Sequence, residues 1–244
     1  MSQSELSLVG NRVPTLVDTP DYPARANALV KQIMSDTPVS ITATTQAWSG
    51  SGLRNGTFAG FIDHYSLNSP RNTYIYSEPY MYIPLHIASK NIDAINVNRL
   101  DKIYRTTVGV ENRFANTDKM RAERSVRWAR APDFLGIIRQ IGDERVDYIL
   151  ADKFMLDEVN KLLFNANRNP LSIGNKPIYI VELRLAINAN YENAQGIIND
   201  FNDKLAAIDK EEALRVINET SLSAEDGDIS LLDEALYQDI LRKW

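Results

Sequence analysis

A single arginine, Arg71, lies between a strand-like apolar run and a tyrosine-rich segment in the stretch FIDHYSLNSPRNTYIYSEPY, residues 61–80. The planar guanidinium of arginine donates two parallel hydrogen bonds to a carboxylate, whereas the ammonium of lysine acts as a point charge. Open α/β folds bind ligands at the carboxyl ends of their strands, and Arg71 follows such a strand in the sequence. Arg71 is therefore a candidate for binding a small acid. A surface arginine or a helix-capping arginine is the alternative.

An aspartate, Asp152, directly follows the strand-like run RVDYILA and precedes the helical run KFMLDEVNKLLF. Its carboxylate is a good N-cap for that helix, and contact with a ligand is the other interpretation. His64 and Glu111 are the candidates for a general base. No Ser-His-Asp, metal or phosphate motif accompanies them, so we expect a protein that is not an enzyme.

The composition excludes several kinds of site. The chain has no cysteine and two histidines, so we expect no cofactor, no metal and no disulfide. The net charge of -5 and a pI near 5.2 argue against nucleic acid as the main partner. The basic segment Arg113–Arg130, with six basic against two acidic residues, is then interpreted as a solvated face.

Apolar patterns predict strands and helices in alternation. Ala26, Leu29, Val30 and Ile33 fall on one helical face between two strand-like runs, which indicates a βαβ unit. Two such series favour two α/β lobes, each with a mostly parallel sheet covered by helices. The predicted strands are 6–17, 39–43, 56–65, 82–89, 106–111 and 145–151, and the predicted helices are 24–35, 133–141, 154–164 and 194–208.

The order of these elements predicts a first lobe that is interrupted by a second. We assign residues 1–90 to the first part of lobe 1, 91–183 to lobe 2, and 184–244 to the return of lobe 1 with C-terminal helices. The segments 90–105 and 176–188 are the predicted crossovers, and each is expected to act as a hinge.

Three stretches resemble a known family. The residues are WSGSGLRNGTFAGFIDHYSLNSPRNTYIYSEPYMYIPLHIAS (48–89), TTVGVENRF (106–114) and IIRQIGDERVDYILAD (137–152). They are similar to the family 3 extracellular solute-binding proteins, which are the polar amino-acid receptors of ABC importers. The resemblance implies a type II periplasmic-binding-protein-like fold, in which two hinged lobes close over a small polar ligand.

The resemblance also implies roles for individual residues. Arg71 stands at the position that binds the ligand carboxylate, and Asp152 at the position that binds its ammonium group. Tyr65 and Ser66 occupy the strand end that contacts the ligand. The other candidate ligand-binding residues are Trp48 and Tyr22 as walls, Asp63 beside His64 in place of small residues, and Asn68 and Asn112. The chain departs from the family pattern at Ala59, Asn68, Pro70 and Asn112, which bears on the choice of ligand.

The leading hypothesis is a monomeric receptor that captures an amino acid or related carboxylate and presents it to a membrane permease. The expected location, implied by the resemblance, is periplasmic. The N-terminus MSQSELSLVG lacks the charged start and long apolar core of a secretory signal, and a mature form restarted with Met1 is the interpretation that fits this location. The alternative is a ligand-sensing or interaction domain of a signalling system, with a sensor protein as partner. A dehydratase-like enzyme on the same scaffold is less favoured.

Overall fold

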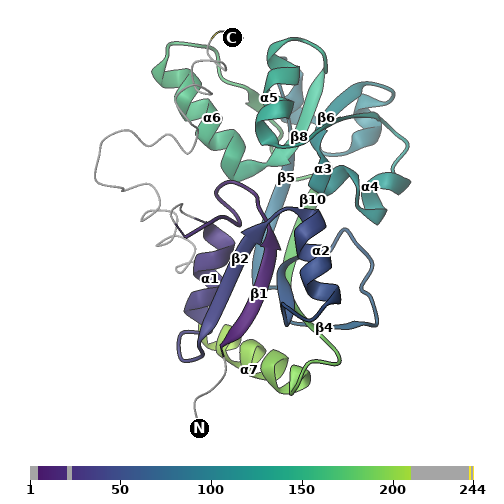
Figure 1. Cartoon of the computed structure of the whole chain (residues 1–244). Coiled ribbons are helices and arrows are strands. Elements are labelled where there is room, and N and C mark those ends of the chain that lie inside the picture. Colours follow the sequence, from purple (N-terminus) through teal and green to yellow (C-terminus); the bar gives the residue numbers. More distant parts are fainter. Residues whose placement is uncertain (1–4, 21–23, 210–241, 243) are drawn as a thin grey trace. The chain divides into compact units, whose positions relative to one another are not determined.

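The computed structural model describes residues 5–20, 24–209, 242 and 244 of the chain (Figure 1). These residues form two compact units. The first contains described residues in 5–82 and 182–209, and the second contains 83–181 with Arg242 and Trp244. The chain passes from the first unit to the second inside strand β5 (Met81–Ser89), and it returns inside β10 (Tyr179–Asn188). None of the helices in the described ranges has the length and apolar character that a membrane span requires.

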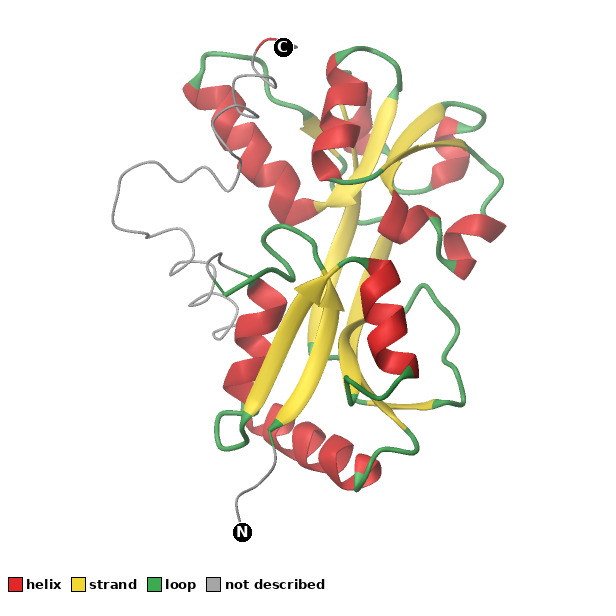
Figure 2. Ribbon diagram, viewed as in Figure 1, coloured by secondary structure: helices red, strands yellow, loops and turns green. Residues whose placement is uncertain are grey.

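The first unit is a sheet with strand order β2-β1-β3-β10. Strands β2, β1 and β3 are parallel, while β10 runs antiparallel to β3 and also pairs with β4. Figure 2 shows these strands with helices packed beside them. The elements that join β10 in this unit are β1 (Leu6–Asn11), α1 (Arg25–Ile33), β2 (Val39–Thr44), α2 (Gln46–Arg54), β3 (Gly60–Tyr65), β4 (Tyr74–Tyr76) and α7 (Ala194–Ala207).

The second unit has the strand order β5-β8-β6-β7, with the short β9 paired to β5. Strands β7, β6 and β8 are parallel, and β5 is antiparallel to β8. The elements beyond β5 are the 3-10 helices Ile92–Asn96 and Leu100–Ile103, β6 (Thr107–Glu111), α3 (Asn112–Ala115), α4 (Asp118–Ala122), β7 (Arg127–Ala131), α5 (Phe134–Gly142), β8 (Tyr148–Asp152), α6 (Lys153–Asn165) and β9 (Ser172–Ile173).

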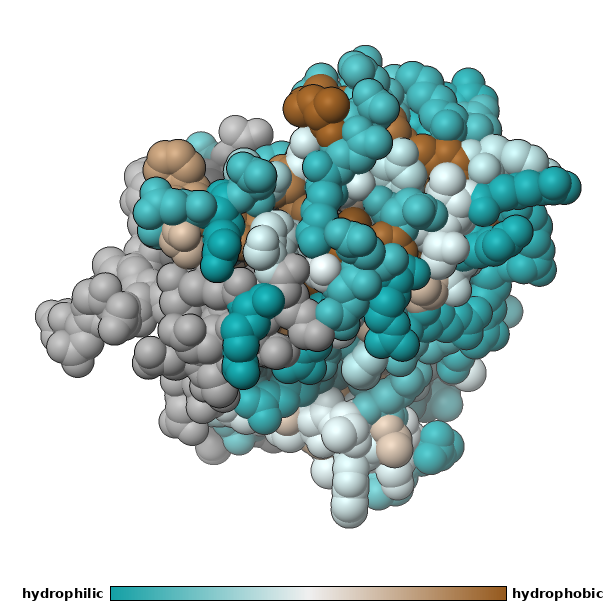
Figure 3. Space-filling view, turned by 90° about the horizontal axis from the view of Figure 1, so that it is seen from above, coloured by the Kyte–Doolittle hydropathy of each residue, from teal (hydrophilic) through white to brown (hydrophobic). Residues whose placement is uncertain are grey.

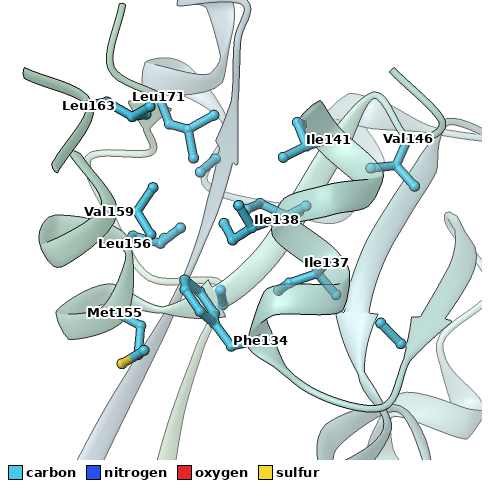
Figure 4. Close-up of a cluster of buried hydrophobic side chains, with 14 residues drawn as sticks. Phe134, Ile137, Ile138, Ile141, Val146, Met155, Leu156, Val159, Leu163 and Leu171 are labelled. Carbon is cyan, nitrogen blue, oxygen red and sulfur yellow. The ribbon is translucent and has the colours of Figure 1, made fainter. Parts of the chain in front are cut away.

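The core of the second unit follows from the helical spacing of apolar residues. In α5, Phe134, Ile137, Ile138 and Ile141 are buried at intervals of three and four residues, as expected for one helical face. Residues of α6 with the same spacing are buried in the same cluster, and Figure 4 shows the labelled side chains of the two helices pointing toward one another. Burial of this kind contributes about 1.5–3 kcal/mol for each large apolar side chain.

The predicted alternation is found, but several boundaries differ. The first strand ends at Asn11 rather than at Val17, because the chain then folds into a loop in which Thr15 has φ 66° and Val13 pairs with Val17. The segment 90–105 lies within the second unit and forms two 3-10 helices, so the chain changes units before it, inside β5. Strands β4, β7, β9 and β10 were not predicted, and β10 lies in the predicted crossover 176–188.

We predict that Gly60→Ala destabilises the protein by about 1–3 kcal/mol, because the new methyl group meets backbone. A Cβ at this position would lie 2.0 Å from Ala186 O, and β3 and β10 would have to separate. Gly50→Ala in α2 is the matched control, since its Cβ meets only Arg54 Nη1 at 3.4 Å and alanine favours a helix. Urea denaturation of both variants checks this, and equal midpoints would contradict it.

Candidate functional site

Three predicted site residues of the first unit, Asp63, Tyr65 and Ser66, lie at the carboxyl end of one of its parallel strands. Strands β2, β1 and β3 end at Thr44, Asn11 and Tyr65. Tyr65 is buried, and Ser66, the next residue, is exposed. Open α/β sheets bind ligands at this edge, where loops leave the strands.

Asp63 joins the ends of two strands. Its buried Oδ2 accepts hydrogen bonds from the backbone N–H of Asn11 at 3.0 Å and from Asn11 Nδ2 at 2.7 Å. Asn11 Oδ1 in turn accepts a hydrogen bond from the hydroxyl of Ser49 at 3.1 Å, and this bond connects α2 to the strand ends. Asp63 therefore has a structural function at the strand ends, and its contact with a ligand remains a prediction. Asn11 and Ser49 were missed, because only the register of β1 against β3 brings them to Asp63.

Arg71 is exposed on the loop of residues 66–73, between β3 and β4. The backbone N–H of Arg71 donates a hydrogen bond to Tyr76 Oη at 2.9 Å, and its carbonyl accepts one from Tyr74 N–H at 3.1 Å. Its guanidinium makes no hydrogen bond and no ion pair with any other residue in the described part of the chain. The backbone of Arg71 is thus fixed while its side chain is available to a ligand.

Four rings pack together beside this loop, on β3 and β4. Their members are Phe61, His64, Tyr74 and Tyr76, with the His64 and Tyr76 ring centroids 4.4 Å apart. Burial of the imidazole, with smaller effects from the charges of Arg184 and Arg71, lowers the pKa of His64 from 6.5 to about 4. His64 is therefore neutral at pH 7, and it is a weak general base.

The candidate residues of the second unit also lie at the carboxyl ends of parallel strands. Asp152 ends β8, is only 1% exposed, and its Oδ1 accepts a hydrogen bond from Phe154 N–H at 3.0 Å as the N-cap of α6. Glu111 ends β6 and accepts two hydrogen bonds from the Arg113 guanidinium, at 2.9 and 2.8 Å. The half-buried Asn112 follows as the first residue of α3.

The remaining candidates of the first unit are Trp48, Asn68 and Tyr22. Trp48 lies on α2 and is 73% exposed, so it is not a core residue of the described structure. Asn68 is half-buried in the loop that carries Arg71. Tyr22 lies outside the described residues.

The basic segment 113–130 forms α3, α4 and most of β7. Its arginines Arg121, Arg124 and Arg127 are exposed, in line with the interpretation of this segment as a solvated face. The face of the molecule drawn in Figure 3 is mainly hydrophilic, with apolar residues scattered over it.

Comparison with known proteins shows the fold. No family model and no curated protein matches the sequence. Among solved structures, the GluR0 ligand-binding core in complex with L-glutamate superposes with a TM-score of 0.68 and 10% identity, over 91% of this chain and all of that one. A mutant of ArgBP from T. maritima superposes with a TM-score of 0.65 and 16% identity, over 91% of this chain and 96% of that one. The third structure is the amino acid ABC transporter substrate-binding protein AbpA from Streptococcus pneumoniae, bound to L-arginine. Its TM-score is 0.62 at 10% identity, over 90% of this chain and 95% of that one.

These similarities confirm the predicted fold class. The chain has the two-lobed, periplasmic-binding-protein-like α/β fold that the sequence led us to expect. At 10–16% identity they establish the fold and not the ligand.

We predict that His64 makes the protein less stable as the pH falls from 6.5 toward about 4. Between these pH values the imidazole is protonated in the unfolded state, where its pKa is near 6.5, but stays neutral in the native state, where its pKa is about 4. The free energy of unfolding therefore decreases as the pH falls. Urea denaturation at pH 7.0 and pH 4.5 measures the loss in the wild type and in His64→Gln. The loss should be smaller in the variant, and an identical loss would show that His64 does not titrate in this way.

We predict that the two possible functions of Asp152 can be separated by substitution. Asp152→Ala should lower the free energy of unfolding by about 0.5–2 kcal/mol through loss of the N-cap, while Asp152→Asn keeps a capping oxygen and most of the stability. Asp133 is the N-cap of α5 and accepts a hydrogen bond from Gly136 N–H at 2.8 Å, and it has no predicted contact with a ligand. Asp133→Ala and Asp133→Asn are therefore the matched controls. If Asp152→Asn were as unstable as Asp152→Ala, the negative charge and not the cap would be what the fold requires.

Proposed function

We propose that the protein is a solute-binding protein that captures an amino acid or a related small carboxylate for an ABC importer. The observation that carries this proposal is the exposed guanidinium of Arg71, which lies on the loop that follows β3 and has no partner among the described residues. The fold supports it, since structures of similar fold hold L-glutamate and L-arginine. The proposed location is periplasmic, and the proposed partner is a membrane permease.

The chemistry of the site favours binding without catalysis. His64 has a pKa of about 4, which leaves it a poor acceptor of protons from a substrate at neutral pH. Both carboxylate oxygens of Glu111 accept hydrogen bonds from Arg113, so this carboxylate is neutralised by its own neighbour. The two residues considered as general bases are therefore unsuited to that role, whereas Arg71 is suited to hold a carboxylate.

We predict that Arg71→Ala reduces the affinity for the ligand by about thirtyfold or more, because a carboxylate loses its charged partner. Thermal-shift screening of the twenty standard L-amino acids identifies a ligand, and calorimetry gives its Kd for the wild type and the variants. Arg71→Lys should retain part of the affinity, since lysine keeps the charge without the bidentate geometry. Without ligand, all variants should unfold within about 0.5 kcal/mol of the wild type.

Arg54→Ala provides the control for a general effect of charge. Arg54 is an exposed arginine in the last turn of α2 in the same unit, and its removal should leave the Kd unchanged. The proposal fails if no amino acid stabilises the wild type, or if Arg71→Ala binds as the wild type does. Asp152→Asn, measured in the same way, tests whether this residue binds the ammonium group.

A further inference from the structure

We infer that Tyr76 is a positioning residue, whose hydroxyl fixes the backbone from which Arg71 reaches the ligand. The inference rests on the proposed function, because Arg71 is its binding residue. The contact that carries it is the hydrogen bond from Arg71 N–H to Tyr76 Oη at 2.9 Å, which joins an exposed loop residue to a half-buried side chain of β4.

The loop of residues 66–73 is attached at one end to β10 and at the other end to the residue that follows β10. Ser66 N–H donates to Glu182 O at 2.9 Å, and Glu182 N–H donates to Ser66 Oγ at 2.9 Å. At the other end, Ala189 N–H donates to Thr73 O at 2.9 Å. Arg71 lies between these anchors, so the ends of the loop alone do not determine its orientation.

The two peptide groups that flank the Arg71 Cα are each fixed by a separate hydrogen bond. The N–H on one side is bound by the Tyr76 hydroxyl, and the carbonyl on the other is bound by Tyr74 N–H. Together they set the direction of the Cα–Cβ bond and leave only the side-chain rotamers of Arg71 free. A binding group that is oriented in advance loses less conformational entropy when the ligand arrives.

The Tyr76 hydroxyl has a defined place because the rest of the residue is held. Tyr76 pairs with Ala186 of β10 through the backbone, and its ring packs on the buried His64 ring at 4.4 Å. The substitution Tyr76→Phe keeps this ring packing and removes only the oxygen that binds Arg71. It is therefore a selective change to the hydrogen bond.

Tyr74→Phe is the matched control. Tyr74 lies two residues earlier in β4, packs on the Phe61 ring at 5.0 Å, and its hydroxyl has no hydrogen bond within the described ranges. Loss of that hydroxyl should affect neither Arg71 nor the ligand. A general effect of removing a tyrosine hydroxyl from β4 would appear equally in both variants.

We predict that Tyr76→Phe speeds amide hydrogen exchange at Arg71 about three- to tenfold, measured by NMR on the ligand-free protein labelled with nitrogen-15. This is the expected effect of losing one neutral hydrogen bond. The Kd for the amino acid found among the twenty standard ones should rise by a similar factor, and the equilibrium constant for unfolding in urea should rise by no more than that factor, because a single hydrogen bond is lost. Tyr74→Phe should leave all three quantities at their wild-type values.

The outcomes separate this inference from the proposed function. Unchanged exchange at Arg71 in Tyr76→Phe overturns the inference, and so does faster exchange with an unchanged Kd. If the wild type binds and Arg71→Ala does not, but Tyr76→Phe binds as the wild type does, the positioning role fails while the proposed function stands. If no amino acid binds the wild type, the proposed function fails and the inference falls with it.

Discussion

The antiparallel attachment of β10 to β3 and β4 is the constraint on which the candidate site of the first unit depends. At Gly60 the two chains approach so closely that a Cβ atom would lie 2.0 Å from the carbonyl oxygen of Ala186. The same strand binds one end of the loop that carries Arg71 and pairs with Tyr76, and the residue after the strand binds the other end of the loop. A strand that returns from the second unit thus fixes the loop, the ring cluster and the candidate binding residue together.

Buried carboxylates and the exposed arginine have different functions in this structure. Asp63, Glu111 and Asp152 are nearly inaccessible, and each accepts hydrogen bonds from its own surroundings, as buried charged groups must. Arg71 is exposed, and its guanidinium has no partner among the described residues. A carboxylate that bound there would not have to break an internal ion pair, which makes the arginine a better candidate for ligand binding than the acids.

The sequence predicted the parts of the fold that follow from local periodicity. The helices α1, α5, α6 and α7 and the parallel strands other than β7 came from apolar spacing, and with them the carboxyl ends of β3, β6 and β8. Residues 12–17 looked like strand because of their apolar types, yet they fold into a loop. The contact of Asp63 with Asn11 depends on how separate segments are aligned across the sheet. The contact of Arg71 with Tyr76 spans five residues and depends on the conformation of an irregular loop. Apolar periodicity contains neither kind of information.

For the ligand that we propose, the charges around Arg71 favour a molecule that brings one negative charge. Arg184, on β10, is compensated by Glu182 at 2.8 Å, and it also donates to the carbonyl oxygen of Ser77. His64, whose ring packs on Tyr76, is kept neutral at pH 7 by its burial. Of these three basic side chains, Arg71 alone keeps a charge with no compensating group in the described structure. One carboxylate neutralises it, whereas a second anionic group would find both other side chains already neutral or paired.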